Sequence, residues 1–250
     1  MFKVFRVVLF KTFSVIRREP IILAPYLLFS LLLTIFLQIG SLKDNMWLFA
    51  LMEWLIPILL IQPFVTLLSI STIKGSTINL RSVFASISNS LRDLFIISLT
   101  YKPIIFFGAL KLSAFDFSNQ NISEVVPLKE LYFIFVLALL GIIIATLLTF
   151  FYPVYFCSKS NKQTKLSGKI KRSLQLFLRF KWITISFTLY FFFVFLFFKL
   201  IFLQVLLAIL PTHLHQLFIQ LTHGIERSIF YVFILRLFYY LNSMISLNDN

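Results

Sequence analysis

Apolar runs of about 20 residues, the length that a helix needs to cross a bilayer, constrain this chain more than any other feature. We place six of them in the 250 residues, at about 21–39, 46–70, 94–112, 131–156, 182–210 and 217–241. The chain is 60% hydrophobic with a mean hydropathy of +0.95, whereas soluble domains are about 45–50% apolar. The sequence therefore predicts an all-α integral membrane protein, a single domain of six transmembrane helices.

Polar residues and prolines interrupt some of these runs. The second run contains Glu53, Pro57 and Pro63, and the third contains Lys102-Pro103. Prolines kink membrane helices and free backbone carbonyls for other hydrogen bonds. The fifth run is long enough to require tilt, a kink or a break near Lys199. With 33 Phe and only 6 Gly, we expect bulky side chains, rather than Gly-x-x-x-Gly contacts, to pack the helices.

The distribution of Lys and Arg predicts the orientation. The segments before runs one, three and five hold five, three and eight of these residues, whereas the opposite loops hold only Lys43, Lys111 and Lys129. Cytoplasmic loops of membrane proteins are enriched in Lys and Arg. We therefore expect both termini in the cytoplasm of a multi-pass protein of the bacterial inner membrane. Cations spread through residues 1–18 are atypical of a cleavable signal peptide; a mitochondrial transit peptide is the alternative, since no acid precedes Glu19.

The basic segment 1–18 has the pattern of an amphipathic helix. At 100° per residue its five cations fall within an arc of about 140°, with Phe5, Val8 and Ile16 among the apolar residues opposite. This pattern is typical of a helix in the headgroup plane, with cations toward anionic lipid. The alternative is a cytoplasmic extension of the first span, packed on its neighbours.

Similar segments at 78–92 and 167–181 precede the third and fifth spans. Aligning them with 1–18 places Thr12, Ser86 and Ser173 together. Because all three segments begin an "amphipathic helix, span, span" unit, we predict cytoplasmic amphipathic helices before spans one, three and five, related by a threefold repeat.

The residues around the first segment resemble a known group of proteins. Phe13-x-x-Ile16-Arg17-Arg18-Glu19-Pro20-Ile21-Ile22-Leu23, a turn containing Gly75, and Val83-Phe84 leading to Arg92 are similar to uncharacterised six-helix bacterial membrane proteins. That group resembles the membrane portion of some glycerophosphoryl diester phosphodiesterases. The catalytic barrel of those enzymes is absent from this sequence, so the resemblance implies no phosphodiesterase activity.

Cations on the predicted cytoplasmic surface are the first set of candidate binding residues. The net charge is +14, but the cations flank apolar spans, so we expect membrane lipids, anionic ones among them, and a membrane or cytoplasmic protein as partners, and no nucleic acid. The lipid-surface set is Lys3, Arg6, Lys11, Arg17, Arg18, Lys169, Lys171, Arg172, Arg179 and Lys181.

Ionisable residues inside the predicted spans are the second set: Glu53, Lys102, Lys199, Glu226 and Arg227. A charge in lipid is costly unless it is paired or hydrated. One interpretation is that ion pairs, Glu53 with Lys102 first among them, fasten the bundle. The other is a polar cavity, open to the outside, that binds an ion, a headgroup or a small solute.

Other chemistry finds little support in the sequence. His213, His215 and His223 are expected to be interfacial polar residues, since residues two apart on a helix do not converge on a metal. The single cysteine, Cys157, is expected to be a reduced structural thiol. We find no catalytic group, cofactor motif or metal site. The sequence thus favours a non-enzymatic membrane protein whose basic cytoplasmic face binds anionic lipid or a partner complex; the alternative is a small transporter using the intramembrane polar residues.

Overall fold

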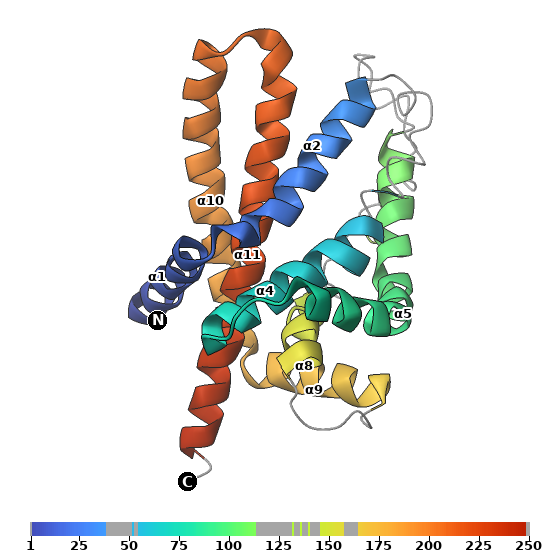
Figure 1. Cartoon of the computed structure of the whole chain (residues 1–250), viewed down its shortest axis with the longest axis vertical. Helices are drawn as coiled ribbons and strands as arrows, with labels where there is room; N and C mark the ends of the chain where they lie inside the picture. The colour runs from blue at the N-terminus through green and yellow to red at the C-terminus, as the bar shows by residue number, and fades with distance from the viewer. Residues whose placement is uncertain are drawn as a thin grey trace.

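The computed structural model describes residues 2–38, 52, 55–113, 132, 136, 140, 146–157 and 165–248, with only the backbone described in places such as 100–113. These residues form helices joined by short turns (Figure 1). In chain order the helices are α1 (Phe2–Arg18), the 3₁₀-helix η1 (Pro20–Leu23), α2 (Ala24–Gln38), the π-helix η2 (Pro57–Ile61), α4 (Gln62–Lys74), α5 (Leu80–Ser113), α8 (Phe151–Cys157), α9 (Leu166–Arg179), α10 (Lys181–Ile209) and α11 (Thr212–Asn248).

Three of the described helical segments are long and apolar enough to cross a membrane. They are Pro57–Lys74, Lys181–Phe202 and Leu217–Ile245, and they match the predicted second, fifth and sixth spans. The chain of α1 and α2 becomes a fourth candidate if the two helices, bent by 102°, are taken as one span. The described residues thus support an all-helical membrane protein.

The fifth predicted span is one continuous helix. α10 runs from Lys181 to Ile209 with no break at Lys199, and its 29 residues extend about 43 Å at 1.5 Å per residue, more than the roughly 30 Å of bilayer hydrocarbon. Only 11% of Lys181–Phe202 is buried inside the molecule, and Phe193, Phe197 and Phe198 are among its exposed side chains. Apolar side chains at this density need lipid, not water, around them.

α11 is the helix around which the others are arranged. It contacts α1, α2, α4, α8 and α10, and its contact with α2 is the most extensive between any two described elements. The two helices meet at Gly224: a Cβ there would lie 2.8 Å from Ser30 Oγ and 3.0 Å from the carbonyl oxygen of Tyr26. Ser228, one turn later, is also fully buried. The crossing therefore depends on Gly224, a small residue that lets two membrane helices approach closely.

This crossing corrects the expectation that bulky side chains do all the packing. Bulky side chains do fill the space between α1, α10 and α11, where Phe191 stacks on Phe195 at 4.3 Å and contacts Phe233 at 5.0 Å. Phe5 of α1 joins the same group, 5.6 Å from Phe187. Small residues thus set the closest helix approach, and aromatic rings fill the wider gaps.

The prolines of the second span free a carbonyl, as predicted. In η2 the N–H of Gln62 bonds to Pro57 O, and Pro63, the next residue, has no N–H. The carbonyl of Ile58 is therefore left without a backbone donor. The hydroxyl of Tyr152 in α8 donates to it at 3.1 Å, and both residues are buried. This bond ties the fourth predicted span to the kink of the second. α5, in contrast, runs through Pro103 without interruption.

The fourth predicted span is not an unbroken helix. Residues 148–150 form a turn between the helical pair 146–147 and α8, and Phe151 N–H bonds to Leu148 O in a tight three-residue turn. Pro153 accounts for the break, because it cannot donate to the carbonyl of Thr149 and its ring crowds the preceding turn. The sequence prediction missed this break because the run of hydrophobic residues continues through it.

The three amphipathic segments end differently. α1 ends at Arg18, before Glu19-Pro20, and the chain turns by 102° into α2. α9 ends at Arg179, before Phe180, whose φ of −118° and ψ of 23° are outside the α region. The second segment is not a separate helix, since α5 continues from it into the predicted third span. Arg92-Asp93-Leu94 contains no helix-stop signal.

Burial shifts the proposed alignment of these segments by one residue. Thr12 and Ser173 are fully buried, but Ser86 is exposed, and Ile87 is the buried residue at that place in α5. Three residues later Val15, Ser90 and Leu176 are all buried. When the second segment is moved by one residue, the three segments therefore have these two buried positions in common.

The close crossing of α2 and α11 predicts a large effect of a single methyl group. Gly224→Ala places a Cβ against backbone atoms of Tyr26 that cannot rotate away, so we expect a loss of about 1–3 kcal/mol, as for overpacking in a core. Gly168→Ala is the matched control, because nothing lies within 4 Å of a Cβ in α9 and alanine favours the helix. Thermal unfolding in detergent measures both; equal midpoints for the two variants would contradict the crossing.

The bond between Tyr152 and Ile58 predicts a coupling between a tyrosine and a proline. Tyr152→Phe leaves a buried carbonyl without a donor, at a cost of about 1–3 kcal/mol. Pro63→Ala returns an N–H to the helix beside that carbonyl. We therefore expect Tyr152→Phe to cost clearly less in the Pro63→Ala background, as a double-mutant cycle of unfolding free energies would measure. Equal costs in both backgrounds would show that the hydroxyl does not serve this carbonyl.

Candidate functional site

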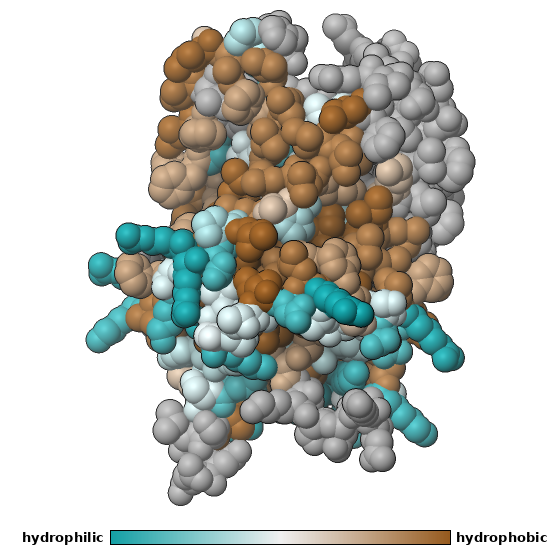
Figure 2. All heavy atoms as spheres, in the orientation of Figure 1, coloured by the Kyte–Doolittle hydropathy of each residue, from teal (hydrophilic) through white to brown (hydrophobic). Residues whose placement is uncertain are grey.

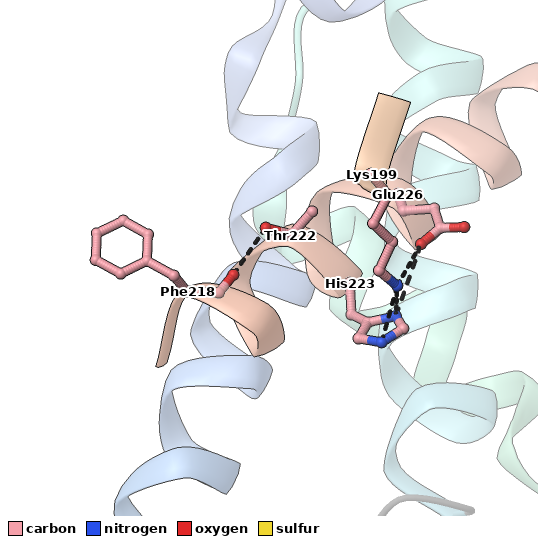
Figure 3. A network of polar contacts seen from close by, with 5 residues as sticks. All are labelled: Lys199, Phe218, Thr222, His223 and Glu226. Atoms are coloured by element: carbon pink, nitrogen blue, oxygen red, sulfur yellow. Dashed lines mark hydrogen bonds and ion pairs between the residues drawn. The ribbon is translucent and has the colours of Figure 1, made fainter. Parts of the chain in front are cut away.

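A cluster of three polar side chains lies between the long apolar helices α10 and α11 (Figure 3). Lys199 Nζ is 3.3 Å from Glu226 Oε2 and 3.0 Å from each ring nitrogen of His223. His223 Nδ1 is in turn 3.6 Å from the same carboxylate oxygen. Lys199 comes from α10, and His223 and Glu226 from one face of α11, so the cluster joins the two helices of the hairpin.

The cluster is largely shielded from solvent. The side chains of Lys199 and Glu226 are 17% and 19% exposed, and that of His223 is 42% exposed. Both helices are apolar around it, so an isolated charge here would be costly in lipid. Mutual pairing of the ammonium and the carboxylate removes most of this cost. The geometry therefore fits an ion pair that holds two spans together, which we call the fastener.

The structure thus brings together two of the five predicted intramembrane residues. Arg227 is half-buried on α11 and has interaction partners of its own. Glu53 lies outside the described residues, and Lys102 is described only by its helical backbone in α5, so the expected Glu53–Lys102 pair remains a prediction.

His223 is the member of the cluster that sequence reasoning missed. It was expected to be an interfacial residue, like His215, whose Nε2 lies 2.9 Å from Leu210 O where α10 ends. The signal for His223 was present, since residues three apart face the same side of a helix and His223 is three residues before Glu226. The side chain of His213 lies outside those described.

The second candidate site is a belt of exposed cations, which we call the basic belt. Figure 2 shows hydrophilic side chains gathered across the lower half of this face, with hydrophobic ones covering the upper left. The belt consists of the exposed residues of the predicted lipid-surface set on α1, on α9 and at the start of α10, which leaves out Lys169. All five cations of α1 are exposed, and none makes an ion pair with a carboxylate that the structure describes.

The apolar face of α1 packs on protein. Phe5, Val8 and Val15 are buried in the cores around α11, while Phe10, within the basic arc, is 76% exposed. This agrees with the alternative in which the segment packs on its neighbours, although the 102° bend means that it does not extend the first span. The cations consequently point outward.

One predicted lipid-surface cation, Lys169, contacts an aromatic ring and is only partly exposed. Lys169 Nζ lies 3.7 Å from the centre of the Tyr155 ring, a cation–π contact, and Tyr155 Oη donates to Asp93 Oδ2 at 2.8 Å. This chain of contacts joins α9, α8 and α5. Lys169 is therefore a structural residue in part, whereas Lys171, Arg172, Arg179 and Lys181 are exposed.

Cys157 follows the last residue of the predicted fourth span and has a hydrogen-bonding partner. Its thiol donates to Tyr239 Oη of α11 at 3.5 Å. Burial raises the pKa of the Cys157 thiol, and the nearby charge of Lys74 acts in the opposite direction. A raised pKa leaves less thiolate at neutral pH, which agrees with a structural thiol.

No protein-family model matches this chain, and neither a characterised protein nor a solved structure is significantly similar to it. The resemblance to six-helix membrane proteins and to the membrane portion of glycerophosphoryl diester phosphodiesterases stays a prediction.

The pairing of Lys199 with Glu226 predicts a non-additive effect on stability. Lys199→Met leaves the carboxylate with only His223, and Glu226→Gln leaves the ammonium without its carboxylate partner and with only His223, so each should cost about 1.5–3 kcal/mol, the range for hydrogen bonds to charged groups. The double variant should cost less than the sum, because no charge is left alone. Unfolding in lipid nanodiscs measures all three.

Lys181→Met, the same substitution at the exposed start of α10, is the matched control and should be nearly neutral. Additive losses in the double variant would mean that the two side chains act independently. Wild-type stability of both single variants would contradict the fastener altogether.

Proposed function

We propose that this protein is a non-enzymatic membrane component whose basic belt binds anionic lipid headgroups at the cytoplasmic surface. The observation that carries the proposal is the set of five exposed cations on α1 without carboxylate partners in the described structure. Cations that are neither buried nor internally paired keep their charge available for an external anion.

Electrostatics and geometry agree in this proposal. A Lys or Arg near an anionic membrane surface contributes about 1 kcal/mol to binding, so several together outweigh thermal energy. α1 lies across the general direction of α10 and α11, and both termini lie in the lower half of Figure 1, away from the turn that joins α10 to α11. A helix in that position presents its cations to the headgroup layer when α10 and α11 cross the hydrocarbon.

The proposal includes the membrane topology. We infer six spans, both termini in the cytoplasm and a location in the bacterial inner membrane, on the basis of the excess of Lys and Arg in the segments before spans one, three and five. We also infer a threefold repeat. The two buried positions that α1, α5 and α9 have in common, and the change of direction that follows α1 and α9, support it.

Two other functions use different residues. A partner complex docked on the basic belt is the second form of the same proposal, since an acidic protein surface would use the same cations. A small transporter would need the intramembrane polar residues to converge on a solvent-connected cavity. The described pairing of Lys199 with Glu226 favours the fastener instead, so the lipid-binding proposal stands first.

Charge removal from α1 is the test of lipid binding. We expect Lys3→Gln/Arg6→Gln/Lys11→Gln to lower the enrichment of phosphatidylglycerol around the protein by up to about a hundredfold, because about 1 kcal/mol is lost for each of the three cations. The enrichment is measured by lipid mass spectrometry of protein extracted in native-lipid particles. The enrichment should also fall with salt, since exposed charges are screened.

The matched control is Lys43→Gln/Lys111→Gln/Lys129→Gln, which removes the same charge from the predicted opposite side of the membrane. Equal enrichment in wild type and the α1 variant would reject lipid binding by the belt. An unchanged lipid profile together with loss of an associated acidic protein from the α1 variant would favour the partner complex.

A further inference from the structure

A pocket of about 260 Å³ opens among the described helices near the C-terminal end of α4. Four elements far apart in the sequence contribute to it. It is lined by Lys74, Val154, Cys157, Arg172, Phe238, Tyr239 and Asn242. Lys74 is the last residue of α4, before the left-handed Gly75 that ends the helix. By the predicted topology this is the cytoplasmic side.

The charge of the pocket is uniformly positive. Lys74 and Arg172 supply two cations, and no carboxylate is among the lining residues. Neither cation makes an ion pair with an acid in the part of the chain that the structure describes, although Lys169, one turn before Arg172, is engaged with Tyr155. Two like charges at one concave site repel each other unless an anion lies between them.

The neutral polar groups of the pocket can donate hydrogen bonds. The thiol of Cys157 and the hydroxyl of Tyr239 are hydrogen-bonded at 3.5 Å, and the tyrosine hydroxyl can both donate and accept. The amide of Asn242 adds two N–H groups, and the guanidinium of Arg172 presents a planar fork that matches phosphate oxygens. Val154 and Phe238 supply an apolar wall. The set provides several donors and two positive charges for a compact anion with at least three oxygen acceptors.

We propose that this pocket binds a phosphate group, which rests on the proposed function in taking the ligand from the cytoplasmic side. The group is either the headgroup phosphate of an anionic lipid or a soluble phosphate. The apolar wall contacts the carbon atoms next to the phosphate when it is esterified. The pocket shares Arg172 with the basic belt, but it also includes Lys74 and is a concave site lined by α4, α8, α9 and α11.

Binding in the pocket can be measured through the reactivity of Cys157, because it is the single cysteine of the chain. An anion between Lys74 and Arg172 covers the thiol and further disfavours its thiolate, so alkylation by a maleimide slows. At a phosphate concentration ten times its dissociation constant, about one-eleventh of the protein remains empty, and the rate falls about tenfold. The full chain is used, stripped of lipid in neutral detergent, with chloride at equal ionic strength as the reference.

Lys74→Gln/Arg172→Gln is the test variant, and Arg81→Gln/Arg92→Gln is its matched control. The control removes the same charge from exposed positions of α5, and neither of its residues lines the pocket or belongs to the basic belt. Because Lys74 itself affects the thiol, the quantity compared is each protein's ratio of rates with and without ligand. Wild type and control should show the slowing, and the test variant should lose it while unfolding at a similar temperature.

Two arms distinguish the source of the phosphate. Inorganic phosphate is added in detergent, and nanodiscs of phosphatidylglycerol with phosphatidylcholine are compared with nanodiscs of phosphatidylcholine alone. Slowing by inorganic phosphate supports a soluble ligand, and slowing only in the anionic nanodiscs supports a lipid headgroup. No slowing in either arm, or equal loss of slowing in the test and control variants, overturns the pocket.

The outcome for the pocket is separable from that for the belt. If phosphatidylglycerol enrichment depends on the cations of α1 and Cys157 is not protected, the pocket fails and the proposed function stands. If Cys157 is protected through Lys74 and Arg172 and enrichment does not depend on α1, the pocket stands and the belt fails.

Discussion

The close approach of α2 and α11 at Gly224 is the contact on which the rest of the described structure depends. Within lipid there is little hydrophobic force between helices, so packing has to hold them together, and packing is strongest where backbones come near. Gly224 permits that approach against Tyr26 and Ser30. With α11 fixed against α2, the remaining face of α11 is available to α1, α4, α8 and α10. Each of these helices is thus placed relative to one central helix.

Around that helix, two polar groups described within the spans have partners in another segment. The Ile58 carbonyl, released by Pro63, is taken by Tyr152, and the Lys199 ammonium is taken by Glu226 and His223. The first bond joins the second and fourth predicted spans, and the second joins the consecutive helices α10 and α11. Unsatisfied polar groups are costly in hydrocarbon, so each bond also specifies which helices pair. These two polar contacts therefore help to determine which helices pack together, since the other contacts between the helices are apolar.

Much of the helix pattern could be predicted from the sequence, because span length and charge distribution are local properties. The predicted fifth span at 182–210 differs from α10 by one residue at each end. The sequence also predicted the amphipathic face of 1–18 and the carbonyl that the prolines of span two free. Pro153 could have indicated the turn at 148–150. We instead predicted one helix, because the apolar run around this proline is 26 residues long. The continuity of α5 was missed because 78–92 and 94–112 differ in composition, and composition does not end a helix.

What could not be predicted depends on contacts between distant segments. Nothing local distinguishes Gly224, which meets a backbone, from Gly168, which meets nothing within 4 Å. The phosphate pocket is assembled from α4, α8, α9 and α11, and a sequence pattern does not place Lys74 beside Arg172. The sequence could therefore indicate which types of residue form a candidate site, but not which residues contact one another.

The orientation of α1 shows how packing and charge act together. Its pattern of cations alone is compatible with a helix floating on lipid, and in that case its apolar face would enter the acyl chains. Instead Phe5, Val8 and Val15 are buried in the protein, so the direction of the cations is set by the bundle. A helix held in this way does not have to spend binding energy on ordering itself at the membrane. The basic belt is thus preorganised for whatever anion it meets, and the same packing that buries α1 gives the belt its single outward direction.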